Sequence, residues 1–367
     1  MSEAAPRPAT LTGPVEIVGT GLLGTSIALA CRRAGLEVLL SDVSPEHVRT
    51  ASGLGAGRPA QPGDEPQLVV VAVPPAFLGA EIATVLRARR SRDDVVVTDV
   101  GSVKAGLHAQ VVRAVGPELA ARYVGSHPMA GSERSGPLAA SYALFEGRPW
   151  AITRHEGNPA RAVALVEELV VLCGALPVRF TPEEHDRAVA RTSHVPHLVA
   201  ALVAARLAEA PGEHLALSGQ GVRDVTRVAA GSPELYGQIV AANAEAVVDL
   251  LGQVRSGLDA MIAALTAEDG VRLRALLARG VDGTRAIPGK HGGPVRPTPS
   301  VFVSVPDEPG VLARLFAAAG ESEVNIEDVR IEHDLGRAVG LVELIVEESR
   351  GDHLAASLES RGWVTHR

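Results

Sequence analysis

A single histidine stands among small residues in the segment GSHPMAGSERSG, residues 125–136. His127 is followed by Pro128, which restricts the backbone, and by glycines that leave room for a bound molecule. An imidazole titrates near neutral pH, so a neutral one can hydrogen-bond a hydroxyl and take its proton. The segment therefore predicts a loop that presents a proton acceptor, with a histidine that only braces the loop as the alternative. Glu133 and Arg134 are expected to line the mouth of such a site or to face solvent.

Three more histidines lie close together in HDRAVARTSHVPH, residues 185–197. His194 and His197 are three residues apart and so share a helix face. Pro196 deprives the same helix of one backbone hydrogen bond, which predicts a bend. His185 opens the helix, where a structural role explains it as well as a functional one. No acidic or cysteine partner completes a ligand set, so we expect no metal.

The segment TDVGSVK, residues 98–104, follows a predicted strand and carries two polar side chains. Ser102 lies at the carboxyl edge of the sheet, where ligands of open α/β sheets bind. Lys104 shares the same turn. It either meets a ligand or only neutralises Asp99 and caps the next helix.

A cation stands in RDVTRVAAGSPELY, residues 223–236. The guanidinium of Arg227 can bind a carboxylate through two parallel hydrogen bonds of fixed geometry. Asp224 lies one turn earlier, so an ordinary ion pair between the two is the alternative.

Three glycines in VEIVGTGLLGTSIALA form G-x-G-x-x-G between a predicted strand and a predicted helix. Gly19 permits the tight turn, Gly21 lets the backbone approach a pyrophosphate, and Gly24 lets helix and strand pack closely. The helix N-terminus then offers free N–H groups to the phosphates. Asp42 ends the next strand, where a carboxylate accepts hydrogen bonds from ribose hydroxyls and repels a 2′-phosphate, which favours NAD. Further contacts with NAD are expected from Leu22, Leu23, Val73 and Pro74.

The elements that position these groups follow from the hydrophobic pattern. Residues 14–157 alternate short β-branched runs with helical segments, which is typical of a Rossmann-type α/β domain with a doubly wound parallel sheet. Residues 158–280 predict an all-α domain of long helices whose wide apolar faces favour a homodimer. A Gly- and Pro-rich linker, 281–298, leads to a small α+β domain, 299–367, with the order βαββαβ, and residues 1–13 form a flexible tail. The strands expected in the first domain are VEIVG, EVLLSD, LVVVAVP, VVVTDV and YVGSHP.

Composition narrows the class of protein. The 367 residues carry a formal net charge of −8 without a basic run, which argues against a nucleic-acid partner. No apolar run is long enough to cross a membrane, and the start of the chain lacks the basic and apolar parts of a signal peptide. Cys31 and Cys173 lie in apolar helical patterns and are expected to be buried free thiols, which fits a cytoplasmic protein.

The order of these segments behind an NAD fingerprint resembles the prephenate/arogenate dehydrogenase family of tyrosine biosynthesis. The resemblance covers about residues 15–280 and is carried mainly by GSHPMAG, SHVPH and DVTRVAAGSP. It implies NAD-dependent oxidative decarboxylation of prephenate to 4-hydroxyphenylpyruvate, in which a hydride leaves a ring carbon and the ring hydroxyl loses its proton. An arogenate dehydrogenase that forms tyrosine directly is one alternative. A catalytically silent protein that senses NAD and an amino acid is another.

The resemblance also implies roles for individual residues. His127 accepts the hydroxyl proton, and the Ser102 hydroxyl orients His127 or touches the substrate hydroxyl. Arg227 binds a substrate carboxylate, and His197 contacts the substrate near its side chain, at the reacting centre with His127 and Ser102. Ser126 and Lys104 are expected as further substrate contacts, and Asp224, His185 and His194 as residues that support them.

Two features qualify the resemblance. Family members often have an aromatic residue just before RD, where this chain has Gly221 and Val222, so prephenate and arogenate stay open as substrates. The C-terminal segments VPDEPGVLARL and VNIEDVRI resemble an ACT domain, a kind of domain that usually binds a regulatory amino acid. Tyrosine, the end product of the pathway, is the expected effector, and a domain that only assists dimerisation is the alternative. The implied effector contacts are Gly310, Val311, Asn325 and Ile326.

Overall fold

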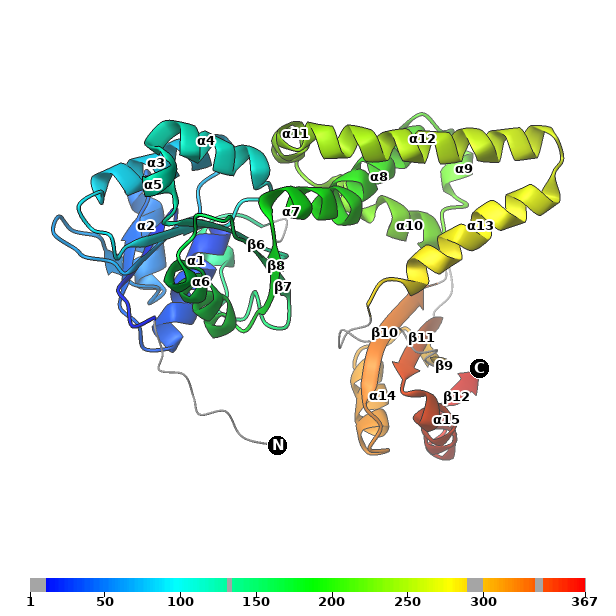
Figure 1. Ribbon diagram of the computed structural model, residues 1–367. Helices are drawn as coiled ribbons and strands as arrows, with labels where there is room; N and C mark the ends of the chain where they lie inside the picture. Colours follow the sequence, from blue (N-terminus) through cyan, green and yellow to red (C-terminus); the bar gives the residue numbers. More distant parts are fainter. Residues whose placement is uncertain (1–10, 131–133, 289–299, 334–338, 367) are drawn as a thin grey trace, which may run out of the picture. The chain divides into compact units, whose positions relative to one another are not determined.

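The chain folds into two units, residues 1–254 and 255–367. The computed structural model describes residues 11–130, 134–288, 300–333 and 339–366 (Figure 1). An eight-stranded sheet organises the first unit, in the order β3-β2-β1-β4-β5-β6-β7-β8. Its strands are β1 (Val15–Val18), β2 (Val38–Ser41), β3 (Arg58–Pro59), β4 (Leu68–Val71), β5 (Val96–Asp99), β6 (Tyr123–Pro128), β7 (Pro149–Thr153) and β8 (Leu176–Phe180).

The five strands expected from apolar runs are confirmed as β1, β2, β4, β5 and β6. Neighbouring strands are parallel except β6 and β7, so the expectation of a wholly parallel sheet is wrong at this end. The sequence pattern does not reveal β8. This strand lies at the sheet edge with mostly exposed residues, among them Pro177 and Arg179, and an edge strand needs no continuous apolar run.

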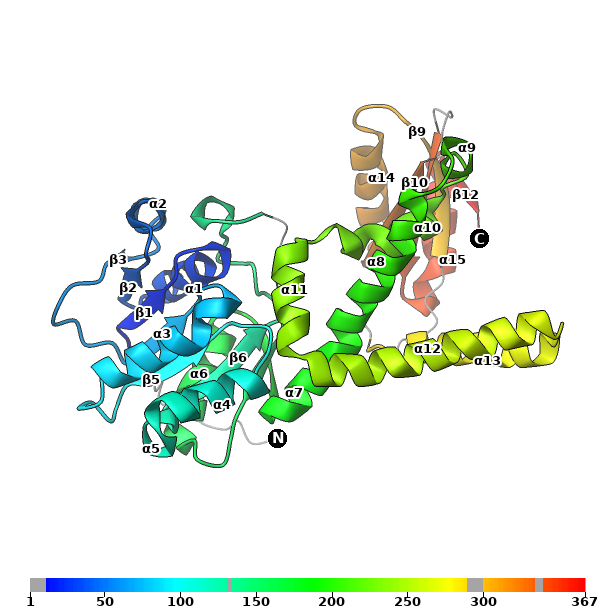
Figure 2. The ribbon, with the colours of Figure 1, turned by 90° about the horizontal axis from the view of Figure 1, so that it is seen from above.

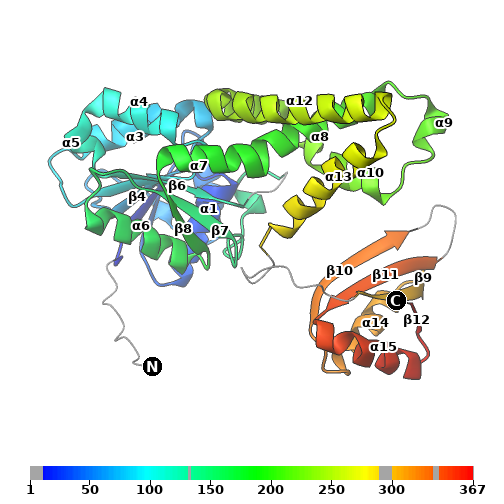
Figure 3. The ribbon, with the colours of Figure 1, turned by 45° about the vertical axis from the view of Figure 1, so that its right-hand side comes forward.

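Helices cover both faces of the sheet (Figures 1 and 3). One face packs against α1 (Leu22–Arg33) and α6 (Ala160–Leu172), and the other against α3 (Pro75–Ala88), α4 (Ala105–Val115) and α5 (Pro117–Ala120). Cys31 and Cys173 are buried free thiols, as expected. Two short elements complete this part, α2 (Pro45–Gly53) and the 3-10 helix η1 (Pro137–Ala139).

The domain boundary predicted after residue 157 is wrong. Helix α6 buries Leu165, Val166 and Leu169 in the same core as strands β1 and β4, and β8 is part of the sheet. The sheet domain therefore extends to Phe180. Its α6 has the same Ala/Leu/Val-rich composition as the helices that follow, which is why composition alone placed it with them.

A continuous helical run begins after Thr181 (Figure 2). It consists of α7 (Pro182–Val189), a π-helical segment η2 (Ala190–His194) and α8 (Val195–Ala208). The irregularity expected at Pro196 takes the form of this π-helical segment, which ends two residues before the proline. Because proline has no N–H, the turn before it loses one α-helical hydrogen bond and the helix changes its winding there.

Further helices follow α8. They are α9 (Gly212–Leu215), α10 (Gln220–Thr226), the 3-10 helix η3 (Arg227–Ala230), α11 (Pro233–Ala242), α12 (Ala244–Thr266) and α13 (Gly270–Arg285). Large apolar side chains on α8 and on the helices and connections that follow it are exposed, and such a surface is typical of an interface between subunits. Examples from the first unit are Leu202, Leu217, Val225 and Val248. Within the described ranges, no helix combines the length and apolarity that crossing a bilayer requires.

The second unit ends in a small antiparallel sheet with the order β10-β11-β9-β12 (Figure 3). The predicted order βαββαβ is confirmed, and both helices bury apolar residues against one face of the sheet. Helix α13 continues to Arg285, so the linker predicted from residue 281 begins later. Residues 289–299 of that linker and residues 1–10 of the predicted tail lie outside the described residues. The elements are β9 (Ser300–Pro306), α14 (Val311–Gly320), β10 (Ile326–His333), β11 (Val339–Val346), the 3-10 helix η4 (Glu348–Arg350), α15 (Gly351–Ser360) and β12 (Val364–His366).

Candidate active site

Four segments with predicted site residues meet at the carboxyl edge of the sheet. Strands β1, β4, β5 and β6 are parallel neighbours, so the segments that follow them meet at one edge. Gly19 follows β1, Val73 follows β4, Ser102 follows β5, and His127 is the second-to-last residue of β6. This is the edge at which open α/β sheets bind their ligands.

The three glycines of the nucleotide motif differ in what surrounds them. Gly19 has φ +99°, and a Cβ there would lie 2.5 Å from the carbonyl oxygen of Ala72. A Cβ on Gly24 would overlap the carbonyl oxygen of Gly19. Gly21, which precedes the first residue of α1, has open space on the side where a Cβ would point. The turn is therefore tight where it packs and open where a pyrophosphate approaches the helix N-terminus, which fits NAD.

Asp42 follows β2 and anchors the loop beside this turn. Its carboxylate accepts hydrogen bonds from the Thr20 N–H (2.6 Å), the Thr20 hydroxyl (3.0 Å) and the Ser44 N–H (2.8 Å). Burial raises the pKa of Asp42, but these hydrogen bonds outweigh it, so its pKa lies below the ordinary value. Three of about four lone-pair positions are thus used, and the remaining one suits a ribose hydroxyl. Leu22, Leu23 and Val73 are half-buried and Pro74 is exposed around the same turn.

Lys104 is buried and bonded within the protein, which contradicts the expectation of a substrate contact. The side chain is 1% exposed, and its ammonium binds the Asp99 carboxylate and the Ser126 carbonyl oxygen, the latter at 2.8 Å. Asp99, fully buried, also accepts hydrogen bonds from the Tyr123 hydroxyl and the Gly101 N–H. The alternative explanation of Lys104, an ion pair with Asp99, is the one that accounts for it.

Ser126 is the second correction. Its side chain is fully buried, and its hydroxyl donates to the Asp99 carbonyl oxygen at 2.6 Å. Oγ of Ser126 also accepts a hydrogen bond from the Trp150 indole N–H at 3.0 Å. Ser126 therefore fixes the end of β6, directly before His127, and leaves no hydroxyl to a substrate.

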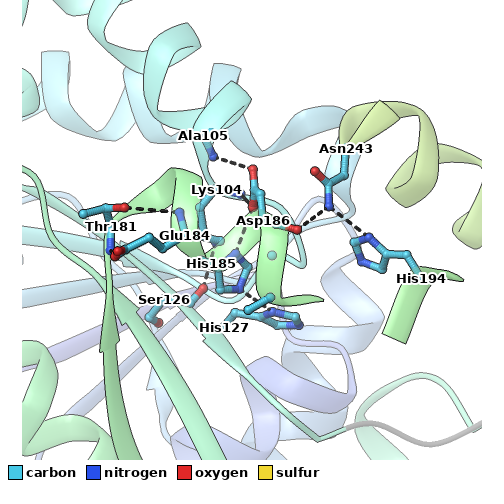
Figure 4. A network of polar contacts seen from close by, with 12 residues as sticks. Lys104, Ala105, Ser126, His127, Thr181, Glu184, His185, Asp186, His194 and Asn243 are labelled. Carbon is cyan, nitrogen blue, oxygen red and sulfur yellow. Dashed lines mark hydrogen bonds and ion pairs between the residues drawn. The ribbon is translucent and has the colours of Figure 1, made fainter. Parts of the chain in front are cut away.

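His127 heads a chain of three side chains (Figure 4). Its Nδ1 lies 3.0 Å from Nε2 of His185, and Nδ1 of His185 lies 2.9 Å from Oδ1 of Asp186. His185 is 1% exposed, whereas His127 is half-buried at the end of its strand. The chain holds the Nδ1 side of His127 inside the protein.

Asp186 joins α7 to α4 (Figure 4). Its two carboxylate oxygens accept hydrogen bonds from the backbone N–H groups of Lys104 and Ala105, both at 2.8 Å. These are orphan donors of the first turn of α4, so Asp186 caps that helix from another element. The start of α7 is fixed in turn by a capping box between Thr181 and Glu184.

His194, in η2, and His197, in α8, are buried as well. Asn243 donates from Nδ2 to the Asp186 carbonyl oxygen at 2.8 Å, and the same nitrogen lies 3.1 Å from Nδ1 of His194. The His197 ring stacks on the Tyr236 ring with centroids 3.5 Å apart and planes inclined by 6°. His197 is thus held flat against an aromatic ring, and His194 belongs to the network around Asp186.

Arg227 and Asp224 are both exposed, and Asp224 is engaged elsewhere. The Asp224 carboxylate accepts a hydrogen bond from the Gln220 side chain at 2.8 Å. The structure therefore does not give Asp224 the role of holding Arg227. Of the segment after GSHPMA, residues 131–133, which include Glu133, lie outside the described residues, and Arg134 is exposed.

The histidines of the site favour the neutral form. Burial lowers the pKa of His127 well below its ordinary value, and the nearby His185, Lys104 and His194 act in the same direction. Burial likewise lowers the pKa of His185, where the Asp186 carboxylate opposes it, and of His194. At neutral pH these rings are neutral and able to accept protons.

We expect the folded state to lose stability as pH falls below about 6.5, the pKa of an unfolded histidine. Burial also lowers the pKa of His108 and His155, so in that range the unfolded chain binds more protons than the folded one. This stabilising contribution is complete above the unfolded pKa and is lost as pH falls toward the folded values. Urea unfolding at pH 7.5 and pH 5.5 measures the difference. The double variant H108Q/H155Q should reduce it, and equal stability of the wild type at both pH values would contradict the prediction.

Several functional residues escaped sequence reasoning. Asp186, Asn243 and Tyr236 were not expected at the site, and Asp99 was expected only as a partner of Lys104. Only Asp186 could have been found from the sequence, because an acidic residue directly after His185 at a predicted helix start can cap a helix or bond to a histidine.

The C-terminal domain presents an open groove of about 570 Å³. Gly310 has φ +85° and precedes α14, and Val311, the first residue of that helix, is buried and lines the groove. Asn325 instead donates a hydrogen bond to Glu327, and neither Asn325 nor Ile326 lines the groove. The groove is lined by Ser304, Val305, Pro306, Val311, Arg314, Arg361, Gly362, Trp363 and Val364.

Two family descriptions match the chain in succession. "Prephenate dehydrogenase, nucleotide-binding domain" matches residues 27–178, and "Prephenate dehydrogenase, dimerization domain" matches residues 181–279. Both meet at the boundary where the sheet domain ends.

Individual relatives agree with these matches. NovF of Streptomyces niveus, a probable prephenate dehydrogenase, is 37% identical over 95% of this chain and 98% of its own length. Prephenate dehydrogenase of Bacillus subtilis is 28% identical over 86% of this chain and 87% of its own. A crystal structure of prephenate dehydrogenase from A. aeolicus with hydroxyphenyl propionate and NAD+ is 27% identical. It covers 74% of this chain and 96% of its own, with a TM-score of 0.64.

Proposed function

The chain belongs to the prephenate dehydrogenase family, and we propose that His127 is the proton acceptor of its reaction. The protein is an NAD-dependent enzyme that oxidatively decarboxylates prephenate to 4-hydroxyphenylpyruvate. The observation that carries the role of His127 is its place at the carboxyl edge, where Nδ1 is bonded to His185 and Nε2 is not part of that contact.

The reaction needs no covalent intermediate between the substrate and the protein. The ring carbon that bears the hydroxyl gives a hydride to NAD+, and the hydroxyl gives its proton to Nε2 of His127. Loss of CO2 then makes the ring aromatic, and its oxygen takes a proton back from the imidazolium. Carbon–carbon cleavage is driven by aromatisation, so the protein has to place the substrate, exclude water and handle one proton.

Other residues complete the proposed site. Because Nδ1 of His127 is already held by His185, Ser102 is better placed to touch the substrate hydroxyl than to orient the histidine. His197, stacked on Tyr236, contacts the substrate near its side chain, and Arg227 binds a carboxylate. Nothing in these residues separates a keto from an amino side chain.

A substrate assay tests this function. Purified protein with prephenate should reduce NAD+ and release CO2 in equal amounts. Comparing kcat/KM for prephenate and arogenate decides which substrate is preferred. Binding of NADH without turnover of either substrate would identify a silent sensor and reject the proposed function.

Arg227→Ala should mainly raise KM for prephenate, because the guanidinium binds a carboxylate that does not take part in bond changes at the reacting carbon. Loss of a charged hydrogen-bond partner typically costs about 1.5–3 kcal/mol, which corresponds to an increase in KM of about 10- to 100-fold. Steady-state kinetics with prephenate and NAD+ measure it. Arg223→Ala, one turn earlier on α10, is the matched control. An unchanged KM in Arg227→Ala would remove this residue from the carboxylate role.

We further propose a homodimer formed through residues 181–279, which the dimerization description and the exposed apolar side chains support. We place the enzyme in the cytoplasm, in keeping with its two free thiols. We also propose that the C-terminal domain binds tyrosine as an effector. Trp363, Arg314 and Arg361 in its groove suit an aromatic ring with a carboxylate, and the assay above, repeated with tyrosine, tests this role.

A further inference from the structure

The network behind His127 contains enough donors and acceptors to locate its protons. The assignment starts from Asp186, because the role of both its carboxylate oxygens is known. Its Oδ1 accepts the Lys104 N–H and its Oδ2 accepts the Ala105 N–H, so both oxygens act as acceptors. Nδ1 of His185, 2.9 Å from Oδ1, must therefore be the donor in that contact.

The next contact follows from the first. A neutral imidazole carries one proton, so His185 with a proton on Nδ1 offers a lone pair at Nε2. Nδ1 of His127, 3.0 Å away, then has to donate to it. This leaves the lone pair of His127 on Nε2, the nitrogen that does not face His185.

The contacts of Asn243 place the proton of His194 on the other ring nitrogen, Nε2. Asn243 Nδ2 donates to the Asp186 carbonyl oxygen, which fixes the orientation of the amide. The same NH2 group donates to Nδ1 of His194, whose proton is therefore on Nε2. Two histidines of one cluster thus carry their protons on different nitrogens, because one faces an acceptor and the other a donor (Figure 4).

We propose that His185 and Asp186 are positioning residues that fix the tautomer of His127, so that Nε2 is available as the proton acceptor. The catalytic part of this inference rests on the proposed function. When His127 becomes charged, its Nδ1–H remains bonded to His185, whose own Nδ1–H is bonded to a carboxylate. The chain thereby stabilises the imidazolium without moving a side chain. In serine proteases a carboxylate bonds directly to the catalytic histidine and sets its tautomer, whereas here His185 lies between the carboxylate and His127.

Neutron diffraction of crystals grown at pH 8 in deuterated solvent tests the proton positions without any turnover. We expect deuterium on Nδ1 of His185 and of His127, none on Nε2 of His127, and deuterium on Nε2 of His194 as an internal comparison. Deuterium on Nε2 of His127 with a bare Nδ1 would overturn the proposal.

Two variants test the consequence for the reaction. His185→Phe keeps a flat ring but offers no acceptor, so His127 loses its tautomer bias, and kcat for prephenate should fall at least about 10-fold with KM for NAD+ unchanged. His185→Gln restores an acceptor opposite Nδ1 of His127 and should recover most of kcat. A purely structural role of His185 predicts equal losses in both variants, and that result would overturn the proposal.

Control variants and the neutron map distinguish failure of this proposal from failure of the proposed function or of folding. His108→Phe and His108→Gln change another partly buried histidine on α4 and should leave kcat unchanged. If the wild type does not turn over prephenate, the proposed function fails, and the neutron map still decides the tautomer. If His185→Phe does not fold, the map and His185→Gln decide.

Discussion

His127→Asn is expected to lower kcat for prephenate by about 10²- to 10⁴-fold, the usual contribution of a proton-transfer group. Asparagine can still donate a hydrogen bond to Nε2 of His185, so the interior chain keeps a polar partner. It has no basic nitrogen to accept the hydroxyl proton. Steady-state kinetics at saturating prephenate and NAD+ measure the loss.

Binding of the dinucleotide provides the control for His127→Asn. The glycine turn after β1 and Asp42 after β2 belong to other strands, so the dissociation constant of NADH should not change. His108→Asn, made in parallel, should turn over prephenate like the wild type. Full activity in His127→Asn would show that another group accepts the proton.

Lys104→Met is expected to lower the free energy of unfolding by about 3–5 kcal/mol, the cost of removing one partner from a buried ion pair. The Asp99 carboxylate, fully buried, would keep its neutral donors Tyr123 and Gly101 but lose the only charged group bonded to it in the described residues. Methionine fills a similar volume, so the loss reports charge more than packing. Chemical denaturation at pH 7.5 measures the effect.

The double variant Asp99→Asn/Lys104→Met separates charge from packing. With both charges gone, it should be more stable than Lys104→Met alone, since no unpaired carboxylate stays buried. An exposed pair such as Arg206 and Glu209 provides the control, because Arg206→Met should change stability by less than about 1 kcal/mol. A small effect of Lys104→Met would contradict a stabilising buried ion pair between Lys104 and Asp99.

The nucleotide turn was predictable because its physics is local. Gly19, Gly21 and Gly24 lie within six residues, and the strand before them and the helix after them follow from short-range patterns. Asp42, which is predicted to bind the ribose, follows the next strand along the chain and could be placed by the same reasoning. His127 could be singled out because a histidine amid glycines has few structural explanations.

The support behind His127 could not be predicted, because it depends on contacts between distant segments. Asp186 bonds to Lys104, 82 positions away in the sequence, and Asn243 bonds to the Asp186 backbone from 57 positions away. Lys104 lies in the core because Asp99 and the Ser126 carbonyl oxygen, which belong to two strands of the sheet, bind its ammonium there. Local sequence patterns do not predict whether a polar side chain is buried by contacts from distant segments. The same holds for the edge strand β8.

The cap that Asp186 provides has a consequence for recombining this enzyme with its relatives. The donors of the cap, Lys104 and Ala105, belong to the sheet domain, whereas the acceptor lies just past Thr181, on the helical side of the boundary. A chimera joined at that boundary would take its α4 N-terminus from one parent and its Asp186 from the other. Two parents whose α4 start and α7 start differ even slightly would give a folded hybrid with a misplaced proton acceptor. Residues 99–105 and 181–186 therefore have to be exchanged together.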